Sequence, residues 1–442
     1  MLGSHFNTII IGAGISGLSS AYFLSKKNKD FLIFESSKYL GGTIKSKKIK
    51  NFICEIGPNT VLMNNDSVKK IIKENGLLNK VLYPDEKKNK NRYVLVNNNL
   101  TKIPTSFYEF LFSKILSLKS KISLLFESFA SRHTKNVTVA DFIKKRFGNE
   151  FHDNIIEPFL TGIYAGDTSK MSARHCLKLL WSLEQNYGSV TMGLFKKKFK
   201  KPSSFNFPNG LGELITTLSV NLKEEIRLNT SVIKISKHGD LYKIKTNDNR
   251  TYTCKNVIST VPAFTLSKIL FDRKLSLELK NIDYSPIDVF HFGLKKKNIR
   301  DKVNGFGLLT KKNDKKSFLG ILFNSSIFNQ LAPKGFELFT VLVGGQRNRN
   351  LCKLEPKLLQ EIILNELNQL INHSGPVYMS NHYRWKKGIP QYNLKYDYIE
   401  DHIKSFLDKN TNFYINSNFY RGISVSDCIS KSEFISKKIN RN

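Results

Sequence analysis

The chain has 442 residues, and its 40% hydrophobic content is sufficient to build the cores of two or three domains. Its formal net charge of +34 favours attraction to a nucleic acid or to the cytoplasmic leaflet of a membrane, although an AT-rich genome would also enrich lysine. No run of 18 apolar residues and no C-x-x-C pair occurs, so we predict no transmembrane helix, no zinc site and no disulfide framework. A strand expected within a few residues of Met1 leaves no room for a signal peptide.

The first thirty-five residues have the order of a dinucleotide-binding βαβ unit. An apolar run ending at Ile11 leads into Gly12-Ala13-Gly14-Ile15-Ser16-Gly17, helix-forming residues follow, and a second apolar run, 31–34, ends at Glu35. The glycines permit a tight turn and close packing, and the helix N-terminus offers free N–H groups to a pyrophosphate. Glu35 is placed to accept hydrogen bonds from ribose hydroxyls. A glycine turn in an unrelated α/β protein is the alternative, and it leaves Glu35 unexplained.

A change of character from about residue 83 predicts helices. Apolar residues recur at spacings of three and four over 107–126, after Pro104, with lysines between them. This pattern is typical of a core-facing helix, and beside a basic surface it also suits an interfacial membrane contact. The helical pattern resumes over 151–159, where Pro158 is expected to end it. Residues 161–167 are then expected to form a glycine-bearing loop.

The second half of the chain returns to alternating strands and helices. We expect helices over 211–222 and 355–371, strands at 231–235, 242–244, 257–260 and 413–416, a strand-rich region over 285–345, and a final helix from about Ser426. Because nucleotide-fold elements lie at both ends of the chain, the cofactor domain is predicted to be discontinuous. We find no helix-turn-helix, zinc-finger or RNP-like pattern, so we expect no nucleic acid partner.

Together these segments resemble the oxygen-dependent protoporphyrinogen oxidases, which are FAD enzymes of the amine-oxidase-like flavoprotein group. The resemblance covers almost the full length and rests on 10–17, 40–42, 55–59, 157–167, Trp181 with Glu184, 389–392, 420–422 and 427–429. It implies an α/β (α+β) fold: a discontinuous FAD-binding Rossmann-like domain, a mixed-sheet substrate domain and a helical membrane-associated insertion. The implied ranges are 1–82, 201–265 and 385–442 for the FAD-binding domain, 83–200 for the helical insertion and 266–384 for the substrate-binding domain.

The resemblance also assigns cofactor contacts by position. They are Gly12, Ala13, Gly14, Ile15, Ser16 and Gly17 for the pyrophosphate, Glu35 and Ser36 for the ribose, Gly42, Thr43, Gly57, Pro58, Asn59 and Thr60 along the flavin, Val232 near the adenine, Trp385 beside the flavin, and Ile423, Ser424 and Val425 at its pyrimidine. Backbone N–H groups at the pyrimidine would stabilise negative charge on reduced flavin. Without its sequence context, Trp385 would be read as an ordinary core tryptophan.

For the substrate, the resemblance places Arg92 at a propionate, where a guanidinium fork suits a carboxylate. From the residues alone, Arg92 would be a solvated member of the basic run 87–92. Leu309 and Leu322 match residues that sandwich the tetrapyrrole, and the Gly162 carbonyl matches one that approaches the pyrrole N–H groups. Two positions depart from the family. Leu342 replaces an aromatic residue of plant members, which affects ring contacts and herbicide-type inhibitor binding, and Ser417 replaces a glycine, which could weaken FAD binding.

The implied function is the FAD-dependent, six-electron desaturation of protoporphyrinogen IX to protoporphyrin IX in haem biosynthesis, with O2 as acceptor. Hydride passes to the flavin, so no catalytic side chain and no metal are expected. The implied location is peripheral, on the cytoplasmic face of a bacterial inner membrane, and a homodimer is compatible with it. Three alternatives stay open: oxidation of coproporphyrinogen III to coproporphyrin III, against which Arg92 argues mildly, an amine oxidase, and a non-catalytic basic scaffold.

Overall fold

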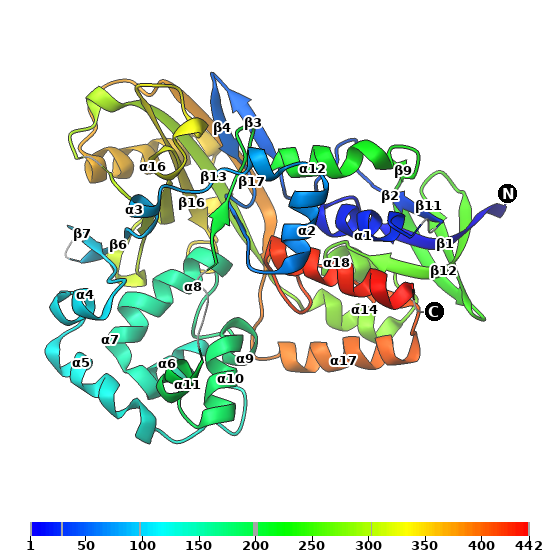
Figure 1. Ribbon diagram of the computed structural model, residues 1–442, viewed down its shortest axis with the longest axis horizontal. Helices are drawn as coiled ribbons and strands as arrows, with labels where there is room; N and C mark the ends of the chain where they lie inside the picture. The colour runs from blue at the N-terminus through cyan, green and yellow to red at the C-terminus, as the bar shows by residue number, and fades with distance from the viewer. Residues whose placement is uncertain (1, 28–29, 97–98, 198–201, 302, 441–442) are drawn as a thin grey trace.

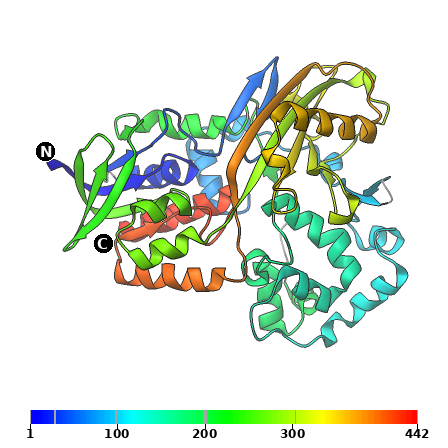
Figure 2. The same ribbon diagram turned by 180° about the vertical axis from the view of Figure 1, so that it is seen from behind.

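The computed structural model describes residues 2–27, 30–96, 99–197, 202–301 and 303–440. Two sheets and a group of helices make up the molecule, and both chain termini lie beside the first sheet (Figure 1). The second sheet and the helical group lie together on the side away from the termini, as both views agree (Figures 1 and 2). The sequence also has a basic run over 196–201, and its residues 198–201 lie outside the described residues.

The first sheet draws its strands from three distant parts of the chain. Its order is β10-β11-β12-β1-β2-β9, with β18 also paired to β12. The strands are β1 (Leu2–Ile11), β2 (Phe31–Phe34), β9 (Ile226–Arg227), β10 (Val232–His238), β11 (Leu241–Thr246), β12 (Thr251–Ser259) and β18 (Phe413–Ile415). β1 pairs in parallel with β2 and β12, and β12 pairs in parallel with β18. The N-terminal unit is therefore completed by residues near both the middle and the end of the chain.

Helices cover both faces of this sheet, so the carboxyl halves of its central strands are largely apolar, with Ile9, Ile10 and Ile11 of β1 and Val257 and Ile258 of β12 buried. All four residues of β2 are buried. One face packs against α1 (Ile15–Ser25), α2 (Asp66–Glu74), α12 (Gly212–Ser219) and α18 (Val425–Ile439). The other face packs against α13 (Ala263–Ile269), α14 (Arg273–Lys280) and α17 (Tyr396–Lys409). This three-layer arrangement leaves the carboxyl ends of the parallel strands free for the glycine turn.

The second sheet is mixed, with the order β17-β13-β16-β15-β14-β6-β7. Its strands are β6 (Arg92–Val96), β7 (Asn99–Lys102), β13 (Tyr284–Lys295), β14 (Gly307–Leu309), β15 (Phe318–Phe323), β16 (Phe336–Gly344) and β17 (Met379–Pro390). β6 and β14 run parallel, and the other neighbours are antiparallel. The helix α16 (Pro356–Ile371) covers one face. Two ranges differ from expectation: β6 and β7 fall within the predicted helical insertion, and β17 runs through the predicted boundary at 384.

The helical group consists of short helices. They are α4 (Phe107–Phe112), α5 (Leu118–Ser123), α6 (Val139–Phe147), α7 (Asn149–Phe151), α8 (Glu157–Tyr164), α9 (Ala173–Cys176), α10 (Lys178–Tyr187) and α11 (Val190–Lys196). The single helix expected over 107–126 is wrong. The chain instead forms α4, α5 and a 3-10 segment, Leu124–Phe129, because the Ser117 hydroxyl caps the N–H of Ser120 and starts a new helix.

The expected loop over 161–167 is also corrected. Pro158 lies in the first turn of α8, where its missing N–H group is not needed, so the proline starts this helix rather than ending the pattern. A π-helical segment, His152–Ile156, leads into α8, and the helix continues to Tyr164. It ends at Ala165, whose φ is +47°. The predicted substrate residue Gly162 therefore lies in the last turn of a helix.

Short elements join these parts. They are β3 (Ser46–Ile49), β4 (Phe52–Glu55), β5 (Val61–Leu62), β8 (Ser204–Phe205), α3 (Glu86–Asn89) and α15 (Asn324–Ile327). Across the described ranges, no helix is both long enough and apolar enough to cross a bilayer.

Candidate functional site

The glycine turn after β1 has no room for side chains at its first and last glycines. Gly12 has φ +102°, and an added methyl carbon would lie 2.6 Å from Thr260 Oγ1. A methyl carbon on Gly17 would lie 1.9 Å from the Gly12 carbonyl oxygen. The Thr260 hydroxyl also donates to the Ile11 carbonyl at 2.8 Å and to the Gly12 carbonyl at 3.0 Å. Thr260, which the motif did not indicate, therefore fixes the shape of the turn from the end of β12.

The N-terminus of α1 is open to an anion. Its N-cap, Gly14, supplies no side-chain cap, and the first turn holds no acidic residue. Gly42 approaches from the next loop, and its added methyl carbon would lie 3.3 Å from Gly14 Cα. Gly14 is partly exposed and Gly42 is exposed. Uncapped N–H groups beside a surface without Cβ atoms fit a pyrophosphate.

Glu35 ties the turn to the loop after β2. Its Oε2 accepts the Ala13 N–H at 2.8 Å, and its Oε1 accepts the Ser37 N–H at 2.8 Å and, more weakly, the Ser36 hydroxyl at 3.4 Å. The Thr230 N–H donates to the Glu35 carbonyl at 2.9 Å, which brings the start of β10, and so Val232, beside this acid. Oε2 accepts one bond and therefore keeps a lone pair for a ribose hydroxyl.

The residues expected along the flavin converge from three elements. A methyl carbon on Gly57 would lie 1.9 Å from the Thr43 carbonyl oxygen, so these two backbones are in contact. The Trp385 indole N–H donates to the Ile56 carbonyl at 2.9 Å, and the Asn59 Oδ1 accepts from Asn324 at 3.0 Å. Pro58 and Thr60 are partly exposed. The arrangement fixes both the loop and the indole on one side of the site.

Two charged residues of this region were not among the predicted contacts. The Lys45 ammonium lies 5.7 Å from the centre of the Trp385 ring. Glu55 is 1% exposed and accepts hydrogen bonds from Ser46 Oγ at 2.7 Å, the Leu211 N–H at 2.7 Å and Asn206 Nδ2 at 3.2 Å. Burial raises the pKa of Glu55 to about 7 against the opposing effect of these bonds.

The expected pyrimidine contacts lie at the start of α18. Gly422 has φ +138°, which turns the chain into that helix. Ser424 and Asp427 form a capping box, in which the Ser424 N–H donates to Asp427 Oδ2 at 3.2 Å. The Ser424 N–H is therefore already used, contrary to our expectation. The N–H groups of Ile423 and Val425 have no protein acceptor in the described part of the chain and are the two that fit a flavin carbonyl.

The departure at Ser417 is accommodated by the backbone. Ser417 is 3% exposed and is not one of the residues with a positive φ, so this position does not require a glycine.

Four of the five predicted substrate residues, all except Gly162, share one face of the second sheet. Arg92, Gly307 and Leu322 are in register on β6, β14 and β15. Leu309, Gly320 and Leu342 are in register on β14, β15 and β16, two residues along from the first row. Residues two apart on a strand point to the same face. A glycine thus lies in the middle of each row, between longer side chains, and both rows belong to the same apolar wall with Arg92 at one end.

Arg92 has no carboxylate partner among the described residues. Its Nη1 donates to the Asn89 carbonyl at 3.0 Å, and its guanidinium lies 4.5 Å from the centre of the Phe306 ring. Burial lowers the pKa of Arg92, but a guanidinium stays charged near neutral pH. A half-buried cation that has only a carbonyl and a ring for neighbours suits an incoming carboxylate.

α8 brings Gly162 against this wall, where its added methyl carbon would lie 2.6 Å from Leu309 Cδ2. Arg347, which sequence reasoning missed, bridges the two elements. Its Nη1 donates to the Thr310 carbonyl at 3.1 Å, next to Leu309, and its Nη2 pairs with Glu157 on α8. The five predicted substrate residues are therefore brought together, with Arg347 holding α8 to the sheet.

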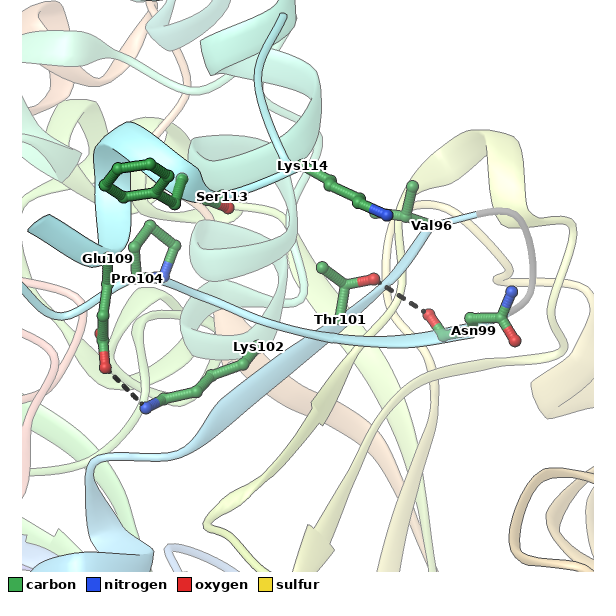
Figure 3. A pocket seen from close by; sticks show the side chains of 9 residues that line it. Val96, Asn99, Thr101, Lys102, Pro104, Glu109, Ser113 and Lys114 are labelled. Carbon is green, nitrogen blue, oxygen red and sulfur yellow. Dashed lines mark hydrogen bonds and ion pairs between the residues drawn. The ribbon is translucent and has the colours of Figure 1, made fainter.

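A separate cavity of about 520 Å³ lies between the β6–β7 hairpin and α4, and none of the predicted site residues lines it (Figure 3). Lys102 crosses it to pair with Glu109 at 2.9 Å, and Lys114 extends toward Val96. The helical group also exposes large apolar side chains, which we call the apolar helical surface: Tyr108, Phe112, Leu118, Ile122, Leu125, Phe126 and Phe129, with Leu179, Met192, Leu194 and Phe195 on α10 and α11.

A family model described as flavin-containing amine oxidoreductase matches residues 15–426 of the chain. The Arabidopsis thaliana protein named protoporphyrinogen oxidase 2, chloroplastic/mitochondrial, is 28% identical over 468 residues, covering 95% of this chain and 91% of that protein. Coproporphyrinogen III oxidase of Bacillus subtilis (strain 168) is 25% identical over 455 residues, covering 97% and 96%.

Two solved structures show the same fold. A protein from Exiguobacterium sp. 255-15, provisionally assigned as a protoporphyrinogen oxidase, superposes with a TM-score of 0.84 at 21% identity and full coverage of both chains. Reduced UDP-galactopyranose mutase superposes with a TM-score of 0.76 at 16% identity, covering 100% of this chain and 94% of the other.

Proposed function

The chain belongs to the family of flavin-containing amine oxidoreductases and is an FAD-dependent oxidoreductase, and from that premise we propose that it oxidises protoporphyrinogen IX to protoporphyrin IX with O2. The observation that carries the substrate is the apolar wall of the second sheet, with Arg92 at its end and Gly162 against Leu309. The Arabidopsis thaliana relative is named a protoporphyrinogen oxidase, and the match covers 91% of its length.

The shape of the wall suits a broad apolar ring. Gly307 and Gly320 bring no side chain to the middle of the two rows, and leucines flank them. Apolar surface of this kind contributes about 25 cal/mol for each Å² removed from water, which favours a large macrocycle over a small amine. Arg92 then takes a propionate at the edge, and this fixes the rotation of the ring in the site.

The protein's part in the reaction is binding and orientation. FAD, when bound, accepts the hydride and passes the electrons to O2. The uncapped N-terminus of α1 would bind the pyrophosphate, and the free N–H groups of Ile423 and Val425 would favour negative charge at the pyrimidine. Gly162 lies against Leu309, and its carbonyl would accept a pyrrole N–H. No acidic or basic side chain is required at the carbon that loses hydride.

Coproporphyrinogen III is the second candidate, because the Bacillus subtilis relative bears that name. That substrate carries four propionates, distributed around the ring, whereas protoporphyrinogen IX carries two at one edge. The wall has Arg92 at one end and leucines at Leu309, Leu322 and Leu342. A single cation at one end favours the substrate with carboxylates at one edge.

The test compares the two porphyrinogens on purified, yellow protein, following porphyrin fluorescence and H2O2. We expect a higher kcat/KM for protoporphyrinogen IX. Arg92→Met should lower it by about 10- to 100-fold, as for the loss of a charged hydrogen bond of about 1.5–3 kcal/mol, while FAD content stays unchanged. Faster turnover of coproporphyrinogen III would make it the substrate in place of protoporphyrinogen IX. A colourless protein without turnover would contradict the proposed function.

We further propose that the apolar helical surface rests on an anionic membrane, which for this chain would be the cytoplasmic face of an inner membrane. Phe129 and Phe195 are 82% and 88% exposed, and Lys114 lines the same cavity as Phe112, another member of this surface. Large exposed apolar side chains with lysines suit an interfacial contact. The net charge of +34 supports attraction to anionic lipid.

Sedimentation with anionic and with neutral vesicles tests this contact. We expect salt-sensitive binding to anionic vesicles and weaker binding of the double variant Phe129→Ser/Phe195→Ser. Phe434→Ser is the matched control, because Phe434 is 68% exposed on α18, in the other part of the molecule. Equal binding of all variants, or none by the wild-type protein, would contradict the proposal.

A further inference from the structure

One lysine ammonium binds three carbonyls of the loop that leads to the flavin. Lys431 lies in the second turn of α18, and its Nζ donates to the carbonyls of Tyr420 at 2.6 Å, Ser417 at 2.7 Å and Gly422 at 3.5 Å. An ammonium has three donors, and here each meets a carbonyl oxygen. The side chain thus reaches back from the helix and holds the loop 416–424 along its length.

No carboxylate in the described part of the chain forms an ion pair with this ammonium. Burial lowers the pKa of Lys431. A buried charge is costly unless hydrogen bonds replace its hydration, and the three carbonyls provide those bonds. Breaking them would leave a cation and several backbone groups unsatisfied, so the loop and Lys431 stabilise each other.

The held loop has a backbone that needs such support. Arg421 has φ +56°, in the left-handed region, and Gly422 has φ +138°. Non-glycine residues adopt that region at a cost of order 1–3 kcal/mol, and only where the surroundings enforce it. Lys431 binds the Ser417 carbonyl before this pair, the Tyr420 carbonyl directly beside it, and the carbonyl of Gly422 itself. At the other end of the loop, Asn416 Nδ2 donates to Ser432 Oγ on the same helix at 2.7 Å.

The residues that follow the loop are the expected pyrimidine contacts. Ile423 begins directly after Gly422, and Val425 is the first residue of α18. The Gly422 carbonyl that Lys431 binds belongs to the same peptide unit as the Ile423 N–H, so Lys431 fixes the orientation of that N–H group. The positive ammonium would also favour negative charge on a flavin held there.

From this geometry we infer that Lys431 is a positioning residue for FAD: by binding the carbonyls of Ser417, Tyr420 and Gly422, it aims the N–H groups of Ile423 and Val425 at the pyrimidine. The inference rests on the bound FAD and is independent of the substrate. It is distinct from the glycine turn, which acts at the other end of the cofactor.

The test measures FAD in Lys431→Met and Lys431→Gln. We expect at least a tenfold higher Kd for FAD, measured by the fluorescence of released flavin, and faster deuterium uptake over 416–425 than elsewhere. The midpoint potential of the flavin that stays bound should fall. A tenfold loss of preference for the reduced form corresponds to about 30 mV for a two-electron couple. Lys431→Gln, which keeps two donors, should be intermediate and provides the measurement if the methionine variant does not fold.

Lys437→Met is the matched control, because Lys437 lies on the same helix, exposed, and pairs with Glu433 at 3.0 Å. It should match the wild-type protein in all three measurements. An unchanged Kd in both Lys431 variants would overturn the inference. So would loss of FAD with an unchanged potential, since that result indicates general destabilisation. None of these measurements uses a porphyrinogen, so failure of the proposed substrate would not affect them.

Discussion

A methyl group at Gly162 would collide with the wall of the substrate site. Its carbon would lie 2.6 Å from Leu309 Cδ2, so either α8 or the Leu309 side chain must move. We expect Gly162→Ala to lower kcat/KM for the porphyrinogen by about tenfold, an effect of about 1.4 kcal/mol, with FAD content unchanged. The measurement is steady-state porphyrin formation together with porphyrin binding.

A compensating change separates this collision from other effects of the alanine. Leu309→Ala removes the atoms that the new methyl group would meet. The double variant should therefore be no worse than Leu309→Ala alone, whereas independent effects would multiply. Full activity of Gly162→Ala alone would mean that α8 and the Leu309 side chain do not lie against each other during the reaction.

The titration of Glu55 predicts a pH-dependent stability. Its folded-state pKa of about 7 lies above the unfolded value, so the folded state binds this proton more tightly. The stabilisation is present at pH 4 and is lost as the pH rises through 7, by about 3 kcal/mol in total. Chemical denaturation from pH 4 to 8 should show the unfolding free energy of the wild-type protein falling relative to Glu55→Gln. Parallel curves would contradict the assigned pKa.

Individual site residues were predictable where a short motif defines them. Gly17 and Glu35 are such cases, because the groups they meet, on Gly12 and Ala13, belong to the same βαβ unit. The motif also indicates Gly12, although the side chain that crowds it is that of Thr260. Thr260 and Lys431 could not be predicted in this way. Thr260 binds a carbonyl that is remote in the sequence, and Lys431 binds backbone carbonyls, which no pattern of side chains indicates. The remaining predicted contacts lie at the positions that the family resemblance assigned, and their roles stay predictions.

α8 depends on an arginine from another part of the chain. Arg347 binds Glu157 and Thr161 on this helix and the Thr310 carbonyl beside the substrate wall. We expect Arg347→Gln to impair substrate binding more than turnover: the rise in KM for the porphyrinogen should exceed the fall in kcat by about tenfold. The reason is that α8 is no longer held against the substrate wall, whereas the flavin contacts are unchanged. Faster deuterium uptake in α8 should accompany the change.

Arg349→Gln is the control for that prediction. Arg349 pairs with Asp283 at 2.7 Å and bonds neither α8 nor β14. Its kinetics should resemble those of the wild-type protein. Equal effects of both variants, or an unchanged α8 in Arg347→Gln, would show that the ion pair with Glu157 does not hold the wall.

Secondary structure was predictable where the apolar period is strong and uninterrupted, as over 355–371, which forms α16. The stretch 107–126 has the same period, but Ser117 caps a new helix and breaks it. Pro158 misled the prediction in the opposite way, because proline both ends helices and begins them. β6 pairs with β14, more than 200 residues away, and no local pattern reveals that partner.

FAD should stabilise the whole molecule, because its site joins segments that are distant in the chain. With free FAD at one hundred times its Kd, the unfolding free energy should rise by about 2.7 kcal/mol. Thermal unfolding of the apo-protein with and without FAD measures this rise. Gly14→Ala should unfold like the wild-type apo-protein, since the nearest atom to its methyl carbon lies 3.8 Å away, but should gain less from FAD. An equal gain would place the pyrophosphate elsewhere.

The discontinuous first sheet has a consequence for synthesis on the ribosome. β1 is made first, yet it must wait for β12, and α1 packs against α18, which ends at Ile439. At about 5–20 residues per second, β1 waits roughly 12 to 50 s for β12, and α1 waits roughly 20 to 80 s for α18. During that time the nascent chain exposes apolar surface that can aggregate. The yield of folded protein in cells should therefore depend on chaperones more than on the stability of the folded state.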